Sequence, residues 1–437
     1  MTKITTSRLI PLAAATISFG ALFALTYFVY GRVLEIRPLS GDNLYILAWA
    51  DRAPATALFA GDPDFYPEWR PLPYSTVWLQ YRWSNLHHVE IYYLINLLLW
   101  SACGWLVYRV VVRLGHSAAG GLLAAGILIT DSQPVFAVSW IIERQSSMAC
   151  IFGLLAMLIV LKPRERPLTR AEWGGASLLL LAAALSKEYG LAFAGAVAVF
   201  AIGEQRDRNL GGRRTAATAI AAVVVYIALR AGFAPGAMTP LCEEMGYFFR
   251  LRRVCYQPLD ATGISQVIYN IVSAGTDSVL HGLFTGDGQI RVAPSLLSFS
   301  VVWLALALIG WAKGDRQTRL TVLLLGFNAV LNFMLYRERN HLIGLCAFAV
   351  AAGVGMSIGS RMLRTRRWAL VVAALVLPGL LVGQTIRTSR VVSSVVDQEL
   401  HKDPCESLTD IPHLDAEFVR RVKDKYDMTN PDCVGAR

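Results

Sequence analysis

The chain has 437 residues, of which 55% are hydrophobic types and only 16% are Asp, Glu, Lys or Arg. A soluble protein carries roughly 25% charged residues, and this chain has a mean hydropathy of +0.46. The composition therefore excludes an ordinary soluble enzyme, a disordered protein and a disulfide-rich mini-domain. The apolar residues come in long Ala/Leu/Val blocks rather than in alternating strands. The sequence predicts an all-α polytopic membrane protein.

Eleven apolar blocks follow one another along the chain, and we expect each to be a membrane helix, although several fall short of the ~20 residues of a full span. They cover residues 9–30, 91–112, 117–130, 146–161, 173–186, 189–203, 215–231, 295–312, 319–336, 341–358 and 367–386. The first block follows Lys3 and Arg8 and has no small-residue cleavage site. We therefore expect an uncleaved anchor rather than a signal peptide.

The basic residues predict the orientation of the chain, because Lys and Arg gather in cytoplasmic loops. With the N-terminus inside, every strongly basic short loop lands inside; these loops carry Lys162, Arg164, Arg166, Arg170, Arg206, Arg208, Arg213, Arg214, Lys313, Arg316, Arg319, Arg361, Arg364, Arg366 and Arg367. The net charge of +10 is thus loop charge and does not indicate nucleic-acid binding.

This orientation divides the chain into four parts and places the C-terminus outside. The parts are a transmembrane module 1–231 that includes the first outside loop 31–90, an outside loop 232–294, a second transmembrane module 295–386, and an outside tail 387–437.

The seven cysteines fall into two groups. Three lie in apolar spans, where a free thiol behaves as a small hydrophobe; they are Cys103, Cys150 and Cys346. The other four lie in pairs in outside segments, where an oxidising compartment favours disulfides. We expect the bridges Cys242–Cys255 and Cys405–Cys433.

The first outside loop opens with Asp42, and the apolar residues between Leu44 and Trp49 suit an amphipathic helix in the membrane interface. Near the N-terminus of that helix, the free N–H groups favour a carboxylate, so an N-cap role is the alternative to a catalytic one. Asp51 follows nine positions later, which is about two and a half turns and places it on the opposite helix face.

Further charges stand at the ends of apolar blocks, and all of them fall on the outside face in this orientation. They are Arg70 before Pro71, Glu143 with Arg144, Lys187 with Glu188, and the group Arg337, Glu338, Arg339 and His341. Charges between apolar helices are costly unless they face a polar cavity. Taken one at a time, each of these charges could also be a structural ion pair or an interfacial anchor. Together they suit an anionic lipid headgroup beside a carboxylate base, because Arg and Lys bind phosphate through charge-assisted hydrogen bonds.

At these residues the sequence resembles the GT-C glycosyltransferases, polytopic enzymes that use polyprenyl-phosphate-linked sugars. Asp42-Asn43-Leu44-Tyr45 resembles the first-loop acidic motif that supplies their catalytic aspartate, with Asn43 in place of a second acidic residue. Arg70-Pro71-Leu72 resembles the donor-phosphate element of the aminoarabinose and protein mannosyl transferases. The segments similar to the tetratricopeptide-repeat-containing transmembrane mannosyltransferases are 93–99, 134–144, 186–188 and Glu338-Arg339.

The resemblance implies a GT-C fold of about 11 transmembrane helices with interfacial helices in the first outside loop, in a bacterial cytoplasmic (inner) membrane. It implies a polyprenyl-phosphate sugar as donor, a glycan, glycolipid or protein as acceptor, and inverting transfer with Asp42 as general base and Asp51 as the alternative. The residues expected to bind the donor phosphate are Arg70, Arg144, Lys187, Arg337 and Arg339. Glu143 and Glu188 would position these cations or bind sugar hydroxyls, and His341 would contact the acceptor or simply end a span.

Two rival functions share some of these features. An O-antigen-type polymerase or ligase would also have a large outside loop and outer-face arginines, but it would not require Asp42. A transporter would place charges near the bilayer midplane and often shows inverted repeats, whereas here the charges stand at span ends and no repeat is visible. The sequence carries no metal-binding motif and no Gly-rich phosphate loop, which suits a lipid-linked donor.

Overall fold

In the computed structural model, the residues that can be described are 9–38, 41–60, 69–132, 134–161, 168–204, 211–233, 294–315, 318–331, 342–363, 367–401 and 415–426. The regular structure of these residues is entirely helical. This confirms the predicted all-α class.

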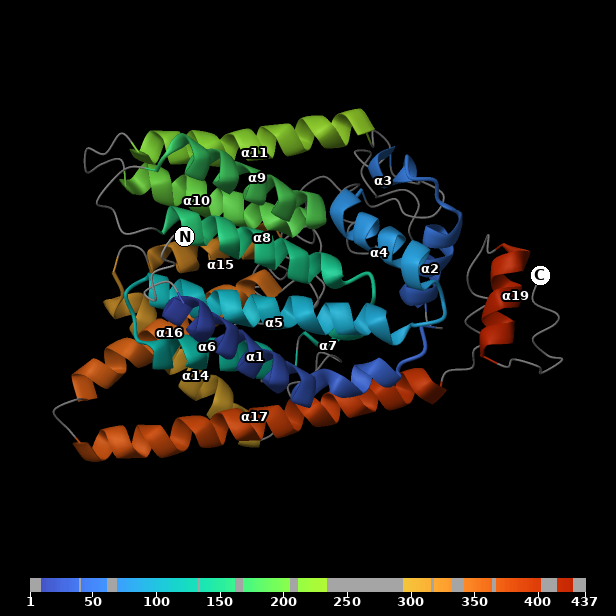
Figure 1. Cartoon of the computed structure of the whole chain (residues 1–437). Coiled ribbons are helices and arrows are strands. Elements are labelled where there is room, and N and C mark those ends of the chain that lie inside the picture. The colour runs from blue at the N-terminus through green and yellow to red at the C-terminus, as the bar shows by residue number, and fades with distance from the viewer. Residues whose placement is uncertain are drawn as a thin grey trace, which may run out of the picture.

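Each of the expected apolar blocks corresponds to a helix, and these helices run roughly side by side through the molecule (Figure 1). They are α1 (Leu9–Tyr30), α5 (Glu90–Arg113), α6 (Ala118–Thr130), α8 (Arg144–Val160), α9 (Arg170–Ser186), α10 (Leu191–Glu204), α11 (Gly211–Phe233), α14 (Pro294–Lys313), α15 (Arg319–Leu331), α16 (Leu342–Met362) and α17 (Arg367–His401).

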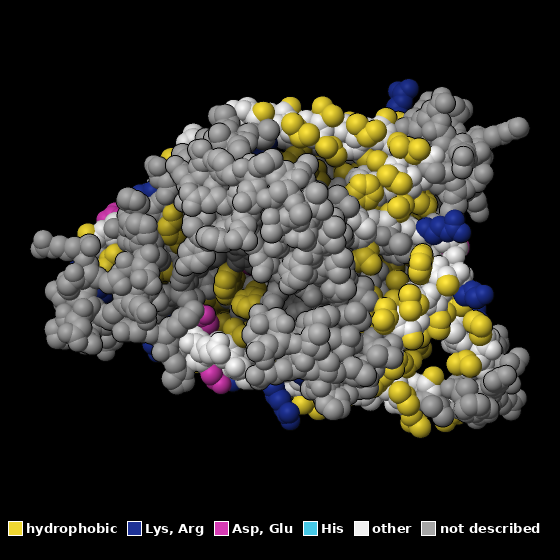
Figure 2. Space-filling view, turned by 180° about the vertical axis from the view of Figure 1, so that it is seen from behind, with side chains coloured by type: hydrophobic (Ala, Val, Ile, Leu, Met, Phe, Trp, Pro, Cys, Tyr) yellow, Lys and Arg dark blue, Asp and Glu magenta, His cyan; other side chains and the backbone are white. Residues whose placement is uncertain are grey.

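Within the described residues, 4 helical segments are long and apolar enough to cross a membrane by length and composition: Ala15–Glu35, Glu90–Arg113, Thr215–Phe233 and Leu342–Met362. Shorter apolar helices accompany them. Exposed Leu, Val, Ile and Phe side chains line the flanks of the bundle, and several Lys and Arg side chains stand at the end opposite α2 and α4 (Figure 2). An exposed apolar flank of this extent is suited to lipid rather than water.

Helix α16 is the centre of the bundle and packs against α6, α14 and α15. Glycines permit the closest approaches, as is common where membrane helices pack without a hydrophobic driving force. A Cβ added at Gly353 would collide with the carbonyl oxygen of Gly120 in α6, and one added at Gly355 would collide with that of Leu306 in α14. These two contacts let the helix backbones touch.

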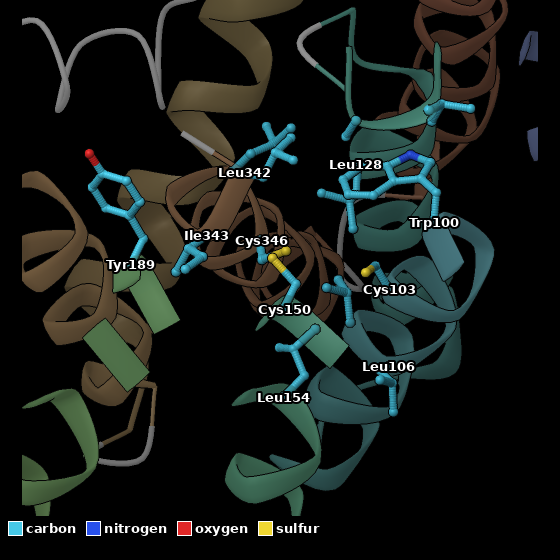
Figure 3. Close-up of a cluster of buried hydrophobic side chains, with 14 of the residues drawn as sticks. Trp100, Cys103, Leu106, Leu128, Cys150, Leu154, Tyr189, Leu342, Ile343 and Cys346 are labelled. Carbon is cyan, nitrogen blue, oxygen red and sulfur yellow. The ribbon is translucent and has the colours of Figure 1, made fainter. Parts of the chain in front are cut away.

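The three span cysteines meet in this core. Cys103 of α5, Cys150 of α8 and Cys346 of α16 are fully buried free thiols among Trp100, Leu128 and other apolar side chains (Figure 3). This confirms the prediction that they behave as small hydrophobes. The other four cysteines, and with them both expected disulfides, lie outside the described residues.

Shorter helices cover one end of the bundle, referred to below as the α2–α4 end (Figure 1). They are η2 (Gly31–Glu35), α2 (Gly41–Arg52), α3 (Ala57–Ala60) and α4 (Pro71–Ser84). The predicted helix after Asp42 is therefore present, but Leu44, Ile46, Leu47 and Trp49 are all buried. Helix α2 is thus enclosed by protein, with apolar side chains on more than one face, rather than lying half-exposed on a membrane surface.

Two elements extend beyond the expected spans. Helix α17 continues to His401, well past the expected end of its span at residue 386, because Val392 and Val396 stand one turn apart and are buried against the core. The tail forms helix α19 (Ala416–Lys425), whose Phe418 and Val422 are buried in the same core. The tail region is therefore partly integrated into the fold.

Candidate active site

Charged side chains from α4, α8, α11 and the α9–α10 turn meet at the α2–α4 end of the bundle. Arg70 immediately precedes α4, and its non-helical backbone (φ −135°, ψ 72°) is followed by Pro71 at the first helical position. A residue before proline is disfavoured in the helical region. The Arg-Pro sequence therefore starts α4 and leaves Arg70 at the N-terminal end of this helix.

The turn between α9 and α10 is as tight as the sequence predicted. Helix α9 ends at Ser186, a single 3₁₀ turn covers Glu188–Gly190, and α10 begins at Leu191. Gly190 is required here, because an added Cβ would collide with the carbonyl oxygen of Ala183. The short turn holds Lys187 and Glu188 side by side at the end of two apolar helices.

Lys187 forms a closed ion pair with Glu143, which precedes α8. The Lys187 Nζ to Glu143 Oε2 distance is 3.0 Å, and the two side chains are 4% and 2% exposed. Ser146 Oγ accepts a hydrogen bond from Lys187 Nζ at 2.7 Å and donates one to Glu143 Oε2 at 2.9 Å. The three side chains form a compact buried unit that ties the α9–α10 turn to the start of α8.

Glu188 forms a second, more open ion-pair group with Arg70 and Arg230. Its Oε2 lies 2.9 Å from Arg70 Nη2, and its Oε1 lies 3.1 Å from Arg230 Nη1. Arg230 also donates to the hydroxyl of Tyr226 at 2.6 Å. Burial alone would raise the pKa of Glu188, but the charges of Arg70 and Arg230 outweigh it and lower that pKa to about 2. Glu188 is therefore ionised at neutral pH.

Gln145 joins the two groups. Its Oε1 accepts a hydrogen bond from Arg70 Nη1 at 2.8 Å, and its Nε2 donates to Glu143 Oε1 at 3.2 Å. The structure thus brings Arg70, Glu143, Lys187 and Glu188 into one hydrogen-bonded network.

Arg144 is separate from this network although it is adjacent to Glu143 in sequence. It is fully buried, and its guanidinium donates to the carbonyl oxygen of Ile141, the Oε1 of Gln80 and the carbonyl oxygen of Tyr92 at 3.1, 2.9 and 3.3 Å. Thr76 Oγ1 is a further acceptor at 3.4 Å. These uncharged acceptors link α4, α5 and the segment before α8, so in this conformation Arg144 faces protein rather than an open site.

The backbone position of Asp42 is confirmed in part: it is the second residue of α2, but its side chain lies outside the described residues. The neighbouring Asn43 is buried, and its Oδ1 accepts a hydrogen bond from the Ile141 N–H at 2.6 Å. This contact anchors the start of α2 two residues from Glu143. Asn43, at the position where the motif that it resembles has a second acidic residue, therefore has a structural role.

Asp51 is engaged elsewhere. Its carboxylate accepts a hydrogen bond from the Tyr81 hydroxyl at 2.9 Å and forms an ion pair with Arg421 of α19. Burial and the nearby Asp51 charge raise the pKa of Tyr81, which keeps the hydroxyl a donor. Asp51 therefore connects α2 to α4 and α19.

The remaining candidates, Arg337, Arg339 and His341, lie outside the described residues. Sequence reasoning missed Gln145, Ser146, Tyr226 and Arg230, which complete the network. The polar residues that follow Glu143 in the sequence indicated that Gln145 and Ser146 could belong to a polar site. Arg230 was harder to recognise, since a single arginine at the end of an apolar block is typical of an interfacial anchor.

The sequence matches no protein-family profile and no curated protein. Its fold, however, is shared with solved structures. The archaeal oligosaccharyltransferase AglB from Archaeoglobus fulgidus, in complex with an inhibitory peptide and a dolichol-phosphate, aligns with a TM-score of 0.54 and 11% identity over 94% of this chain. The apo form of the Archaeoglobus fulgidus oligosaccharyltransferase aligns with the same TM-score and coverage at 10% identity.

This chain spans 59% of the length of those neighbours. At this identity the likeness concerns the fold alone: the chain shares the helical architecture of those oligosaccharyltransferases.

Proposed function

We propose that this protein is a membrane glycosyltransferase that moves a sugar from a polyprenyl-phosphate donor to an acceptor hydroxyl. The observation that carries the proposal is the network of Arg70, Lys187, Glu143 and Glu188 at one end of a GT-C-like bundle. Such a site offers cations for a leaving phosphate at the level where a lipid headgroup meets water. Fixed charges of this kind often supply the largest share of catalysis.

The reaction is a single inverting displacement. The acceptor oxygen attacks the anomeric carbon, the bond from that carbon to the phosphate oxygen breaks, and its electron pair leaves with the polyprenyl phosphate. Asp42 takes the acceptor proton as general base. The engagement of Asp51 by Tyr81 and Arg421 supports Asp42 over Asp51 for this role.

Arg70 is the cation that contacts the departing phosphate, and Glu188 holds it in place until the donor binds. Lys187, paired with Glu143, adds a fixed positive charge close to this position. Arg144 contributes by positioning, because it joins α4 and α5 to the segment that carries Glu143. The positive-inside pattern supports an orientation in which the α2–α4 end faces outward from a bacterial cytoplasmic membrane, with the N-terminus inside.

The acceptor is a glycan, a glycolipid or a protein. We assign Arg337, Arg339 and His341 to the same face.

The proposal is tested with purified protein and a panel of radiolabelled polyprenyl-phosphate sugars. One member of the panel should show release of lipid phosphate that depends on an added acceptor fraction. The Asp42→Asn variant should lose about 10²–10⁴-fold of this activity and keep the wild-type unfolding temperature. Asp51→Asn is the matched comparison on the same helix and should retain far more activity. Release by a well-folded Asp42→Asn variant at the wild-type rate would refute the assignment of the base, and no release across the panel would refute the function.

A further inference from the structure

The two ion-pair groups at the α2–α4 end differ in how open they are. The Lys187–Glu143 pair is sealed, with side chains 4% and 2% exposed. In the other group the side chain of Glu188 is 28% exposed, whereas the side chains of its partners Arg70 and Arg230 are 10% and 14% exposed. The anion is thus the most accessible member of its own cluster, and an incoming ligand meets Glu188 first.

The two arginines converge from distant parts of the chain on the two oxygens of one carboxylate. Arg70 binds Oε2 through both Nε, at 3.0 Å, and Nη2, at 2.9 Å, in a forked arrangement. Arg230 binds Oε1 at 3.1 Å. A carboxylate and a phosphate present similar pairs of acceptor oxygens to a guanidinium fork. The geometry that holds Glu188 therefore also fits a phosphate.

The immediate surroundings of this cluster are apolar on one side. Trp69 directly precedes Arg70, Tyr226 lies four residues before Arg230, and the ring centroids of the two aromatic residues lie 6.2 Å apart. They form a small hydrophobic cluster that is distinct from the main core. Helix α11, which carries Tyr226 and Arg230, exposes Ile220, Val224 and Ile227 along its outer surface, as expected of a helix that faces lipid.

From these observations we infer that Arg70 and Arg230 form a clamp for the phosphate of a prenyl phosphate, and that Glu188 is a built-in counter-ion which the phosphate displaces. The prenyl chain then lies along the exposed outer face of α11, next to the buried rings of Trp69 and Tyr226. The inference rests on the proposed function and deepens it by adding Arg230 and an exchange of anions. Before binding, Glu188 offsets one of the two guanidinium charges; after binding, the phosphate takes its place.

If the phosphate displaces Glu188, then neutralising an arginine and neutralising Glu188 should change the affinity for farnesyl phosphate in opposite directions. Arg230→Gln removes one charge-assisted contact to the phosphate, so affinity for farnesyl phosphate should fall about ten- to a hundredfold. Glu188→Gln removes the competing carboxylate, so affinity should rise about tenfold. Glu188→Asp keeps the charge and should stay within about threefold of the wild type. A carboxylate that bound the substrate directly would give the reverse result for Glu188→Gln.

Binding is measured by calorimetry on the full chain in detergent, with farnesyl phosphate, farnesol and inorganic phosphate as the three probes. Farnesyl phosphate should bind much more tightly than either of the others. Equal binding of inorganic phosphate would show that the clamp takes free phosphate and would overturn the lipid assignment, and equal binding of farnesol would overturn the clamp. Arg420→Gln, which removes an exposed ion pair with Glu417, is the matched arginine control and should bind like the wild type.

Arg230→Gln can decide the question even if Glu188→Gln fails to fold, because Glu188 remains paired with Arg70 in that variant. Wild-type affinity in Arg230→Gln would overturn the inference. If this happened while sugar transfer persisted, the proposed function would stand without the clamp. Conversely, farnesyl phosphate binding could follow the predicted pattern while no sugar of the panel is transferred. That result would support the clamp and refute the proposed function.

Discussion

Replacing Lys187 by methionine removes an ammonium group from beside Glu143, whose carboxylate is 2% exposed and lies 3.0 Å from Lys187 Nζ. Methionine fills a similar volume, so the main change is the loss of charge and of the hydrogen bond to Ser146. Ser146 and Gln145 also donate hydrogen bonds to Glu143. These are uncharged donors and do not offset a buried negative charge.

Removing one partner of a buried ion pair destabilises a protein by about 3–5 kcal/mol, because the other charge stays buried without compensation. We expect Lys187→Met to fall in this range. The double variant Lys187→Met with Glu143→Gln removes both charges of this pair, and the amide of glutamine can still bond to Ser146. It should regain most of the loss, to within about 1–2 kcal/mol of the wild type.

The measurement is a double-mutant cycle by denaturant unfolding in mixed micelles, combined with the transfer assay. The exposed pair Arg420–Glu417 is the matched control, and Arg420→Met should leave stability unchanged. If Lys187 also contacts the donor, the double variant should be stable but inactive. A Lys187→Met protein as stable as the wild type, or a double variant no more stable than this single one, would refute the reasoning.

Three further predictions concern the tail, the pH dependence and the helix packing. Arg421→Gln breaks the ion pair between α19 and α2 and should speed limited proteolysis at α19 severalfold; an unchanged rate would contradict the docking of this helix. The low pKa of Glu188, about 2 against an ordinary 4.5, means that its ionised form stabilises the fold above about pH 4.5 and that this contribution is lost as the pH falls toward 2. The stability difference between wild type and Glu188→Gln should therefore shrink over that interval, and a difference independent of pH would argue against the ion pairs. Gly355→Val forces α16 away from the carbonyl oxygen of Leu306 and should cost about 1–3 kcal/mol, whereas Gly359→Ala, with open space around it, should be nearly neutral in the same thermal unfolding experiment.

The helices could be predicted from the sequence because the signal for a membrane helix is local. A run of apolar residues such as 91–112 indicates a helix whatever it packs against, and the structure places α5 over Glu90–Arg113. The end of α17 could not be predicted in this way. Its last turns are polar on average, and their helical state depends on Val392 and Val396 finding the core.

The charged residues could be recognised as unusual, but their partners could not. Lys187 and Glu188 stand out because two apolar blocks leave no loop between them. That Lys187 pairs with Glu143, and Glu188 with Arg70 and Arg230, depends on helices separated by many residues in the chain. The roles of Arg144 and Asp51 differ from expectation for the same reason, since burial among α4, α5 and α19 engages both side chains.

The sequence by itself determined the class of molecule, the positions of its helices, the burial of the three span cysteines and the set of charges that needed an explanation. These are properties of composition and of short segments, because the transfer of apolar residues into a lipid-like environment depends little on the neighbours. Only the tertiary structure decided which charges pair, which are sealed and which remain open. Ion pairing depends on distances of a few ångströms between residues far apart in the chain, and packing alone sets those distances.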